Sequence, residues 1–453
     1  MAIIILYASI MLVTALPGLR RMASVEGFVT GGRRSGSIMV AASLVATIVG
    51  ASSTLGMAEL ARTFGGAAFW WLGLGAVGLV LMAWLTARPL WDLKALSIAD
   101  AVTRLAGRGA GRLTGSIIVI AWTGIIAAQL VAIGSVLAAF SAADPAVVIL
   151  IAGLSVTLYT VIGGQRGVIR TDLIQLLILG GGMTIVFVLL AGQGSSREGL
   201  VLQPLLHKGF DAERLLFMAF PLLGAYAAGP DMFSRINAAR SAGVARRGLV
   251  LAAFAIVAFG ALVTSLALMA LDLPGDGVQR NPLLGAVMNI LPEGIALLFV
   301  LALVSAMVSS ADTCLLTAGS ILGHDLAGSS DLVRVRALVA LAGVAATLLA
   351  LFFRDIIGLM ISSYAVYTAG IASPLVVALV ARAKGKYPER HWFLAGMLAG
   401  GACGLASAIC VQPFLTVVGA ALGAVLALLS LRGVPAGGHP QDNPGCRSPR
   451  QGA

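Results

Sequence analysis

The sequence predicts an all-α polytopic membrane protein with about 13 transmembrane helices. Of its 453 residues, 59% are hydrophobic and only 11% are charged, whereas ordinary soluble domains carry about 25% charged residues. The apolar residues form long runs, and most basic residues fall in alternate gaps between those runs. This pattern excludes an ordinary soluble domain.

Thirteen apolar segments are each long enough to cross a bilayer, which takes roughly 20 residues of helix. They cover 1–18, 38–58, 66–88, 114–140, 144–163, 171–193, 214–234, 248–272, 286–323, 335–353, 356–381, 392–411 and 413–431.

The basic residues predict the orientation of these segments. Most of the 30 Lys and Arg residues lie in alternate loops, including Arg33–Arg34, Arg235 and Arg246–Arg247. By the positive-inside rule, those loops are cytoplasmic. We therefore expect a multi-pass protein of the cell's inner (plasma) membrane, with its N-terminus outside and its C-terminus in the cytoplasm. The net charge of +11 follows from this topology and does not indicate nucleic acid; lipid is the expected surrounding. No Lys or Arg is expected in the membrane interior.

The other segments are organised around Leu303–Asp325, an apolar run with a polar centre. On a helix its polar residues share one stripe; they are Ser305, Ser309, Asp312, Thr313 and Thr317. The hydroxyl groups alone fit close helix packing. Asp312, however, lies about 20 Å along the helix from Asp325, and an aspartate at that depth costs roughly 2.5–3.5 kcal/mol. Asp312 therefore favours a polar cavity or an ion path.

Two of the expected helices contain residues that interrupt a helix. In 38–58 the run Gly50 to Thr54 weakens it, and either a bend or a break fits this pattern. A break would free the carbonyls of Ala46 to Gly50 to line a cavity or hold a cation. In 214–234, a break is expected at Gly224, Gly229 and Pro230. Breaks at corresponding positions of two halves point to the binding site of an inverted-repeat transporter.

These breaks suggest how the chain is divided. The expected parts are a first transmembrane helix and cytoplasmic loop at 1–37, five-helix repeats at 38–193 and 214–382, two accessory helices at 383–432 and a disordered cytoplasmic tail at 433–453.

Other polar groups inside apolar segments have two interpretations each. Asp172 at the start of the sixth segment is either an N-terminal capping residue or part of a cation exit path. Side chains near the breaks either line a substrate site or find structural partners in neighbouring helices. These substrate candidates are Ser52, Ser53, Trp122, Gln129, Tyr226 and Tyr364.

Three stretches resemble the sodium:solute symporter family, and the resemblance extends over roughly residues 1–432. They are YTVIGG…TDLIQ at Tyr159–Gln175, GPDMFSR at Gly229–Arg235 and SAMVSSADTCLLTAGSILGHDL at Ser305–Leu326. The second is more similar to the branch for proline and organic acids than to the sugar branch, because Gly229–Pro230 stands where the sugar branch has Asn–Gln. Other departures are Arg170, where the family has an aromatic residue, and Ile48, where some members carry an acid.

The resemblance implies a leucine-transporter-like core of two inverted five-helix repeats plus outer helices, which works by alternating access. It implies a sodium site made by the carbonyls of Ala46, Val49 and Ala306 with the hydroxyls of Ser309 and Ser310. Neutral oxygens of this kind suit a hard cation that has to leave again. Asp172 and Asp312 would lie on the ion path. Sodium is thus the expected coupling ion, with no organic cofactor and no enzymatic activity.

The expected function is sodium-coupled symport of a small organic solute, an amino acid or a carboxylate, into the cytoplasm. The helix N-termini at the breaks would hold a substrate carboxylate. Two alternatives remain: a membrane solute sensor or signalling partner with the same fold, and a carrier coupled to protons through Asp312 or Asp172.

Overall fold

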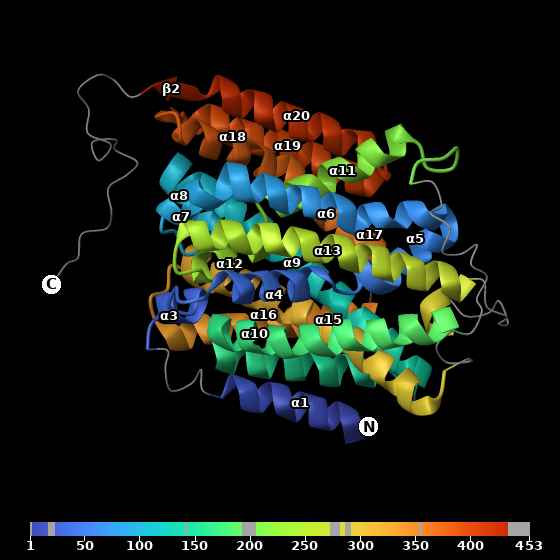
Figure 1. The fold of residues 1–453 in the computed structure, drawn as a ribbon. Helices are drawn as coiled ribbons and strands as arrows, with labels where there is room; N and C mark the ends of the chain where they lie inside the picture. The colour runs from blue at the N-terminus through green and yellow to red at the C-terminus, as the bar shows by residue number, and fades with distance from the viewer. Residues whose placement is uncertain are drawn as a thin grey trace.

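The computed structural model describes residues 2–16, 23–140, 143–192, 205–271, 281–285, 291–352 and 356–433. They form a bundle of helices that lie side by side along one common direction (Figure 1). Helix α1 begins at one end of this bundle and strand β2 lies at the other. The expected tail lies outside the described residues, apart from Gly433.

The first half of the chain, to residue 192, consists of long helices and of short ones joined end to end. In order they are α1 Ala2–Ala15, α3 Val25–Thr30, α4 Ser37–Ile48, η1 Ser52–Gly56, α5 Met57–Phe64, η2 Gly65–Phe69, α6 Trp70–Leu81, η3 Met82–Thr86, α7 Ala87–Asp92, α8 Ile98–Ala106, α9 Arg108–Phe140 and α10 Pro145–Gly192.

The second half repeats this mixture of long and short helices and adds two three-residue strands. The elements are α11 Ala212–Ala227, α12 Pro230–Ala238, α13 Ala242–Leu271, α15 Glu293–Ser320, η4 Ile321–Leu326, α16 Leu332–Phe352, α17 Ile356–Tyr367, η5 Thr368–Ala372, α18 Ser373–Arg382, β1 Lys386–Pro388, α19 Arg390–Cys410, α20 Pro413–Leu429 and β2 Leu431–Gly433. The strands pair antiparallel, with Lys386 opposite Gly433.

Nine helical stretches within the described ranges are long and apolar enough to cross a membrane. The chain is therefore a multi-pass membrane protein. Two stretches, Ser52–Asp92 with 41 residues and Pro145–Gly192 with 48 residues, are at least about twice as long as the roughly 20 residues that one crossing needs. Two further apolar helices, Ser37–Ile48 and Pro413–Leu429, are shorter than that. Nine is thus not a count of crossings, and the number 13 stays a prediction.

A single residue divides α10 into two lengths. Gly164 has φ 51° and ψ −161°, which is not helical; this backbone favours glycine. A Cβ at Gly164 would also lie 2.6 Å from a ring carbon of Phe28. The glycine pair Gly163–Gly164, between the expected segments 144–163 and 171–193, predicts a tight turn, and the turn is present. Asp172, however, lies inside the second length and not at its start, so the expected capping role is wrong.

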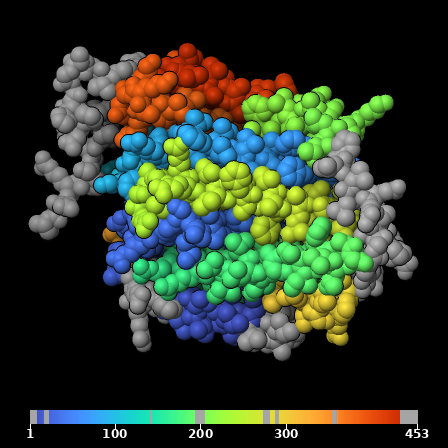
Figure 2. Space-filling view, in the orientation of Figure 1, coloured from blue at the N-terminus to red at the C-terminus, as the bar shows by residue number. Residues whose placement is uncertain are grey.

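The outer surface of the bundle is apolar. Ile120, Phe254 and Phe352 are 75%, 74% and 82% exposed, an exposure that soluble proteins avoid over large areas. Figure 2 shows one face on which the blue, green and yellow-green parts of α4, α10 and α13 adjoin as parallel bands. Segments distant in the sequence thus form one lipid-facing surface, and polar groups gather inside.

Candidate ion and substrate sites

The first expected interruption is a true break. Helix α4 ends at Ile48, Val49 leaves the helical region at ψ 76°, and the chain resumes as η1 at Ser52. Side chains replace the lost backbone partners at the break. The amide of Gly50 donates to Ser53 Oγ at 2.9 Å, and the amide of Ala51 donates to Gln129 Oε1 at 2.8 Å. This contact supports the structural interpretation of Gln129 over its interpretation as a substrate ligand.

The carbonyls before this break meet two hydroxyls of α15. Ser309 Oγ donates to the carbonyl of Ala46 at 2.7 Å, and Ser310 Oγ donates to that of Thr47 at 2.7 Å. Both hydroxyls also lie close to the carbonyl of Ala306, at 2.9 and 3.1 Å. We call these five oxygens the oxygen cluster. It joins α4 to α15 with neutral groups.

The cluster contains four of the five sodium ligands that the resemblance implies. Val49 takes part in none of these hydrogen bonds, and the carbonyl of Thr47 contacts Ser310 instead. The close packing of the cluster requires glycine at position 50, because a Cβ there would lie 2.4 Å from Ser310 Oγ. Three carbonyls and two hydroxyls are ligands that suit a hard cation.

The second interruption lies between α11 and α12. Helix α11 ends at Ala227, Gly229 is extended at φ −59° and ψ 137°, and α12 starts at Pro230. The break expected at Gly229 and Pro230 is thus confirmed. The break expected at Gly224 is wrong, since α11 continues through it. Gly224 instead allows close packing: a Cβ there would lie 2.2 Å from Thr368.

Arg235 lies in the interior and not in a loop. Its side chain is 1% exposed, and Nη2 lies 2.9 Å from Asp172 Oδ2. The expectation that no Lys or Arg is buried is therefore wrong. The guanidinium also donates to four hydroxyls of three helices, namely Ser43, Thr47, Ser234 and Thr313. We call Arg235, Asp172 and these hydroxyls the arginine cluster.

The two buried acids that are expected on the ion path have different partners. Asp312 accepts a hydrogen bond from Tyr159 at 2.6 Å and one from Thr313 at 3.2 Å. Asp172 Oδ2 accepts from Ser43 and Arg235, whereas its Oδ1 has no partner within the described part of the chain. Thr47 connects the two clusters, because its hydroxyl accepts from Arg235 and its carbonyl accepts from Ser310.

Among the six substrate candidates, the aromatic ones lie together. The ring of Trp122 packs edge-on against Tyr364 at 6.4 Å and against Tyr367 at 5.0 Å. The indole N–H of Trp122 is buried and has no partner in the described ranges. Tyr226 and Ser52 are also buried. Ser53 is engaged by the first break, where it donates to the carbonyl of Ile48 at 2.7 Å.

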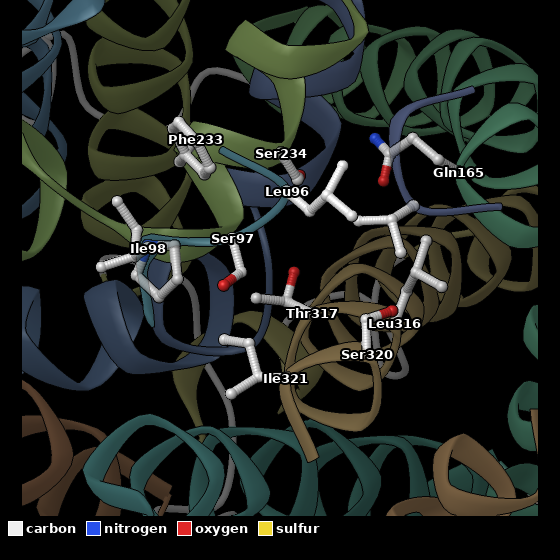
Figure 3. Close-up of a pocket in the computed structure, with 12 residues that line it drawn as sticks. Leu96, Ser97, Ile98, Gln165, Phe233, Ser234, Leu316, Thr317, Ser320 and Ile321 are labelled. Carbon is white, nitrogen blue, oxygen red and sulfur yellow. The ribbon is translucent and has the colours of Figure 1, made fainter. Parts of the chain in front are cut away.

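A cavity with about 300 Å³ of empty space, part of it open to solvent, lies beyond the arginine cluster. Figure 3 shows its side chains coming from separate segments, including α10, α12 and α15. They are Val29, Leu96, Ser97, Ile98, Gln165, Pro230, Phe233, Ser234, Leu316, Thr317, Ser320 and Ile321. Ser234 belongs to both the cavity wall and the arginine cluster. Ser234 therefore separates the cavity from the buried guanidinium of Arg235, to which it is hydrogen-bonded.

A family model described as "Sodium:solute symporter family" matches residues 28–381, most of the chain. The chain belongs to this family. It is therefore a transporter and not an enzyme, and sodium-coupled symport is the mode of transport that the family indicates.

Similar proteins agree with this assignment. The human sodium/iodide cotransporter is 29% identical over 167 residues, which is 36% of this symporter and 25% of that relative. A sodium-coupled sialic acid symporter in a substrate-bound, outward-open state has a similar structure, with a TM-score of 0.79 at 19% identity over 96% of this chain and 98% of that one.

Two more distant structures share the fold. MhsT in complex with L-phenylalanine gives a TM-score of 0.59 at 15% identity, over 86% of this chain and 99% of that one. A nucleobase-cation-symport-1 family transporter, closed on bromovinylhydantoin, gives 0.53 at 11% identity over 88% and 93%. At these identities the similarity concerns the fold, which is the expected leucine-transporter-like architecture.

Sequence reasoning missed two charged residues of the site, Asp231 and Arg235. Both lie in the stretch Gly229–Arg235 that carries one of the family motifs. The available signal was the break itself. A helix that restarts at Pro230 inside the bundle keeps its first turns, and with them both side chains, in the interior.

Proposed function

We propose that this symporter imports a small organic solute across the inner (plasma) membrane together with Na⁺, and that Na⁺ binds at the oxygen cluster. The single observation that carries this proposal is the contact of Ser309 and Ser310 with the carbonyls freed by the first break. Charges within the oxygen cluster would hold a cation too firmly for release into the cytoplasm, whereas neutral oxygens bind it and let it leave.

The cluster gives a physical reason for coupling. The two hydroxyls belong to α15 and their carbonyl partners to α4. A cation shared by both sets of oxygens favours the conformation in which the helices are close, since it interacts differently with the two states. Loss of the cation leaves only hydrogen bonds, each worth about 0.5–1.5 kcal/mol net. Sodium occupancy would thereby bias the alternating-access equilibrium.

The ion path leads from the oxygen cluster towards the cavity. Asp172 offers its free Oδ1 to a departing cation, and Arg235 holds the other oxygen. In this proposal the cavity that Ser234 lines is the cytoplasmic mouth of the path, and the N-terminus lies outside. A proton-coupled carrier would instead use Asp312, whose carboxylate Tyr159 contacts.

The test is uptake into proteoliposomes under imposed gradients. Solute accumulation should follow an inward sodium gradient and not a proton gradient; the reverse would favour proton coupling. Binding without accumulation under either gradient would favour the sensor. L-amino acids and small carboxylates are the first solutes to be tested.

A double variant and a control test whether Na⁺ binds at the oxygen cluster. Replacing Ser309 and Ser310 together by Ala should raise the sodium concentration for half-maximal uptake by about ten-fold or more, the equivalent of two lost contacts. Ser430→Ala is the control, because Ser430 is also buried and donates to a carbonyl, that of Ala427, at 2.6 Å. Unchanged sodium dependence of the double variant would remove the oxygen cluster as the site.

A further inference from the structure

The start of α12 carries a buried carboxylate that the sequence analysis did not use. Asp231 is 9% exposed and follows Pro230, the first residue of α12. Its Oδ1 lies against the break, 3.0 Å from where a Cβ on Gly229 would be. Asp231 stands in the first turn of α12, where the positive end of the helix dipole stabilises a carboxylate. It therefore occupies the helix end that was expected to hold a substrate carboxylate.

This carboxylate has no cation of its own. Within the described part of the chain no Lys, Arg or His forms an ion pair with Asp231. Arg235, one turn further along α12, attracts Asp231 electrostatically, but it forms its ion pair with Asp172 and donates to the hydroxyls of the arginine cluster. A buried charge without a partner is costly, so a ligand that brings the opposite charge would be stabilised there.

Aromatic side chains from three helices, α9, α11 and α17, lie near the second break, which Asp231 follows. Asp231 interacts electrostatically with the phenols of Tyr226, Tyr364 and Tyr367. Tyr367 donates to the carbonyl of Ala228 in the second break at 2.6 Å. The ring of Trp122 packs on Tyr364 and Tyr367, and its buried indole N–H has no described partner.

A carboxylate beside several aromatic rings is the arrangement that recognises organic cations. Ring faces attract ammonium groups, and the attraction grows where water is excluded. An anionic group at the same place would be repelled by Asp231, and Arg235 is already held by Asp172 and the hydroxyls of the arginine cluster. The site therefore favours positively charged nitrogen.

We propose that Asp231, with Trp122, Tyr226 and Tyr364, binds a positively charged nitrogen of the transported solute. The solute is then an amino acid or another amine, and carboxylates without an ammonium group are poor substrates. This inference rests on the proposed carrier function and narrows its substrate class.

The experiment measures ligand-induced stabilisation of the purified full chain in NaCl. The probes are matched pairs that differ only in the ammonium group: L-alanine and propionate, L-leucine and 4-methylpentanoate, and L-phenylalanine and 3-phenylpropionate. Tetramethylammonium tests the cation alone. At least one ammonium-bearing probe should raise the melting temperature, whereas its carboxylate partner should not. The proposal is overturned if the carboxylates bind as well as their amino counterparts, or if no ammonium-bearing probe binds.

Variants separate recognition from a structural role of Asp231 at the helix end. Asp231→Asn keeps the size of the side chain and an accepting oxygen but removes the charge; it should weaken binding of the ammonium-bearing probe at least about thirty-fold. Asp144→Asn is the control, since Asp144 is likewise an acid at a helix start, where it accepts from the amide of Ala146 at 2.8 Å. Unchanged affinity of Asp231→Asn would assign the carboxylate to the helix alone.

A second pair of variants tests the same site without changing Asp231, so that the inference can be judged even if Asp231→Asn does not fold. Tyr364→Phe keeps the ring and should bind the ammonium probe nearly as tightly as the wild type, whereas Tyr364→Leu should bind it several-fold more weakly. Equal binding by both would contradict the aromatic contribution. Sodium-dependent stabilisation is recorded for every sample. If it persists while the ammonium preference fails, only this inference falls; if it is absent from the wild type, the proposed sodium coupling falls.

Discussion

The two breaks differ in the buried charges that lie next to them, although carbonyls at the second break also accept from hydroxyls, those of Thr86 and Tyr367. At the first break, all the contacts are neutral: amides meet Ser53 and Gln129, and carbonyls meet Ser309 and Ser310. The second break is followed by a nine-residue helix with a buried acid in its first turn and a buried arginine in its last. A broken helix therefore does not define one kind of site.

The difference suits two tasks. Neutral oxygens fit an ion that binds and leaves within each cycle. Fixed charges fit contacts that persist, because separating a buried ion pair is costly. On this account the first break holds the coupling ion. At the second, the ion pair of Arg235 with Asp172 ties α12 to α10, whereas Asp231, which has no ion pair in the described residues, is free to contact the solute.

The largest expected effect comes from the arginine cluster. Arg235→Gln leaves Asp172 buried without its cation and should destabilise the protein by about 3–5 kcal/mol, seen as a large drop in melting temperature and loss of uptake. The double variant with Asp172→Asn carries no unpaired charge there and should regain most of this stability. A single variant as stable as the wild type would contradict the account of the second break.

A smaller effect is expected at the first break. Gly50→Ala places a Cβ 2.4 Å from Ser310 Oγ and 2.9 Å from Gln129 Oε1. Such overpacking should cost about 1–3 kcal/mol and raise the sodium requirement of uptake. Gly181→Ala is the control, because no atom lies within 4 Å of the added group. Equal sodium dependence in the two variants would show that the cluster tolerates displacement of Ser310.

The smallest effect concerns a single hydroxyl at the second break. Tyr367→Phe removes the hydrogen bond to the carbonyl of Ala228 and keeps the ring, so a loss of about 0.5–1.5 kcal/mol is expected. Tyr387→Phe in β1 is the matched change outside the site, where Arg382 still covers the ring. Similar melting temperatures for both variants would mean that the hydroxyl does not hold the break.

Local residue chemistry explains what the sequence predicts well. Glycine next to hydroxyl residues marks the first break, Gly229–Pro230 marks the second, and Gly163–Gly164 marks the turn in α10, because each effect arises within a few residues. The meeting of Ser309 with Ala46 came from the family resemblance. The two residues are 263 positions apart, a separation that no local pattern bridges.

Non-local contacts explain what the sequence failed to predict. Arg235 follows directly after the apolar segment 214–234, and a charge in that position is typical of a loop. The sequence alone therefore places Arg235 outside the membrane interior. Its partner Asp172 lies 63 positions earlier, and only the folded chain brings them together. Gly224 failed for a related reason: its missing side chain makes room for Thr368 of η5 and does not interrupt α11.

The most direct test of the central claim is a pair of density maps of the protein, one in NaCl and one in KCl. The account predicts a sodium-dependent peak among the carbonyls of Ala46 and Ala306 and the hydroxyls of Ser309 and Ser310, which is absent in KCl. A sodium-dependent peak elsewhere, with this cluster unchanged between the two maps, would contradict it.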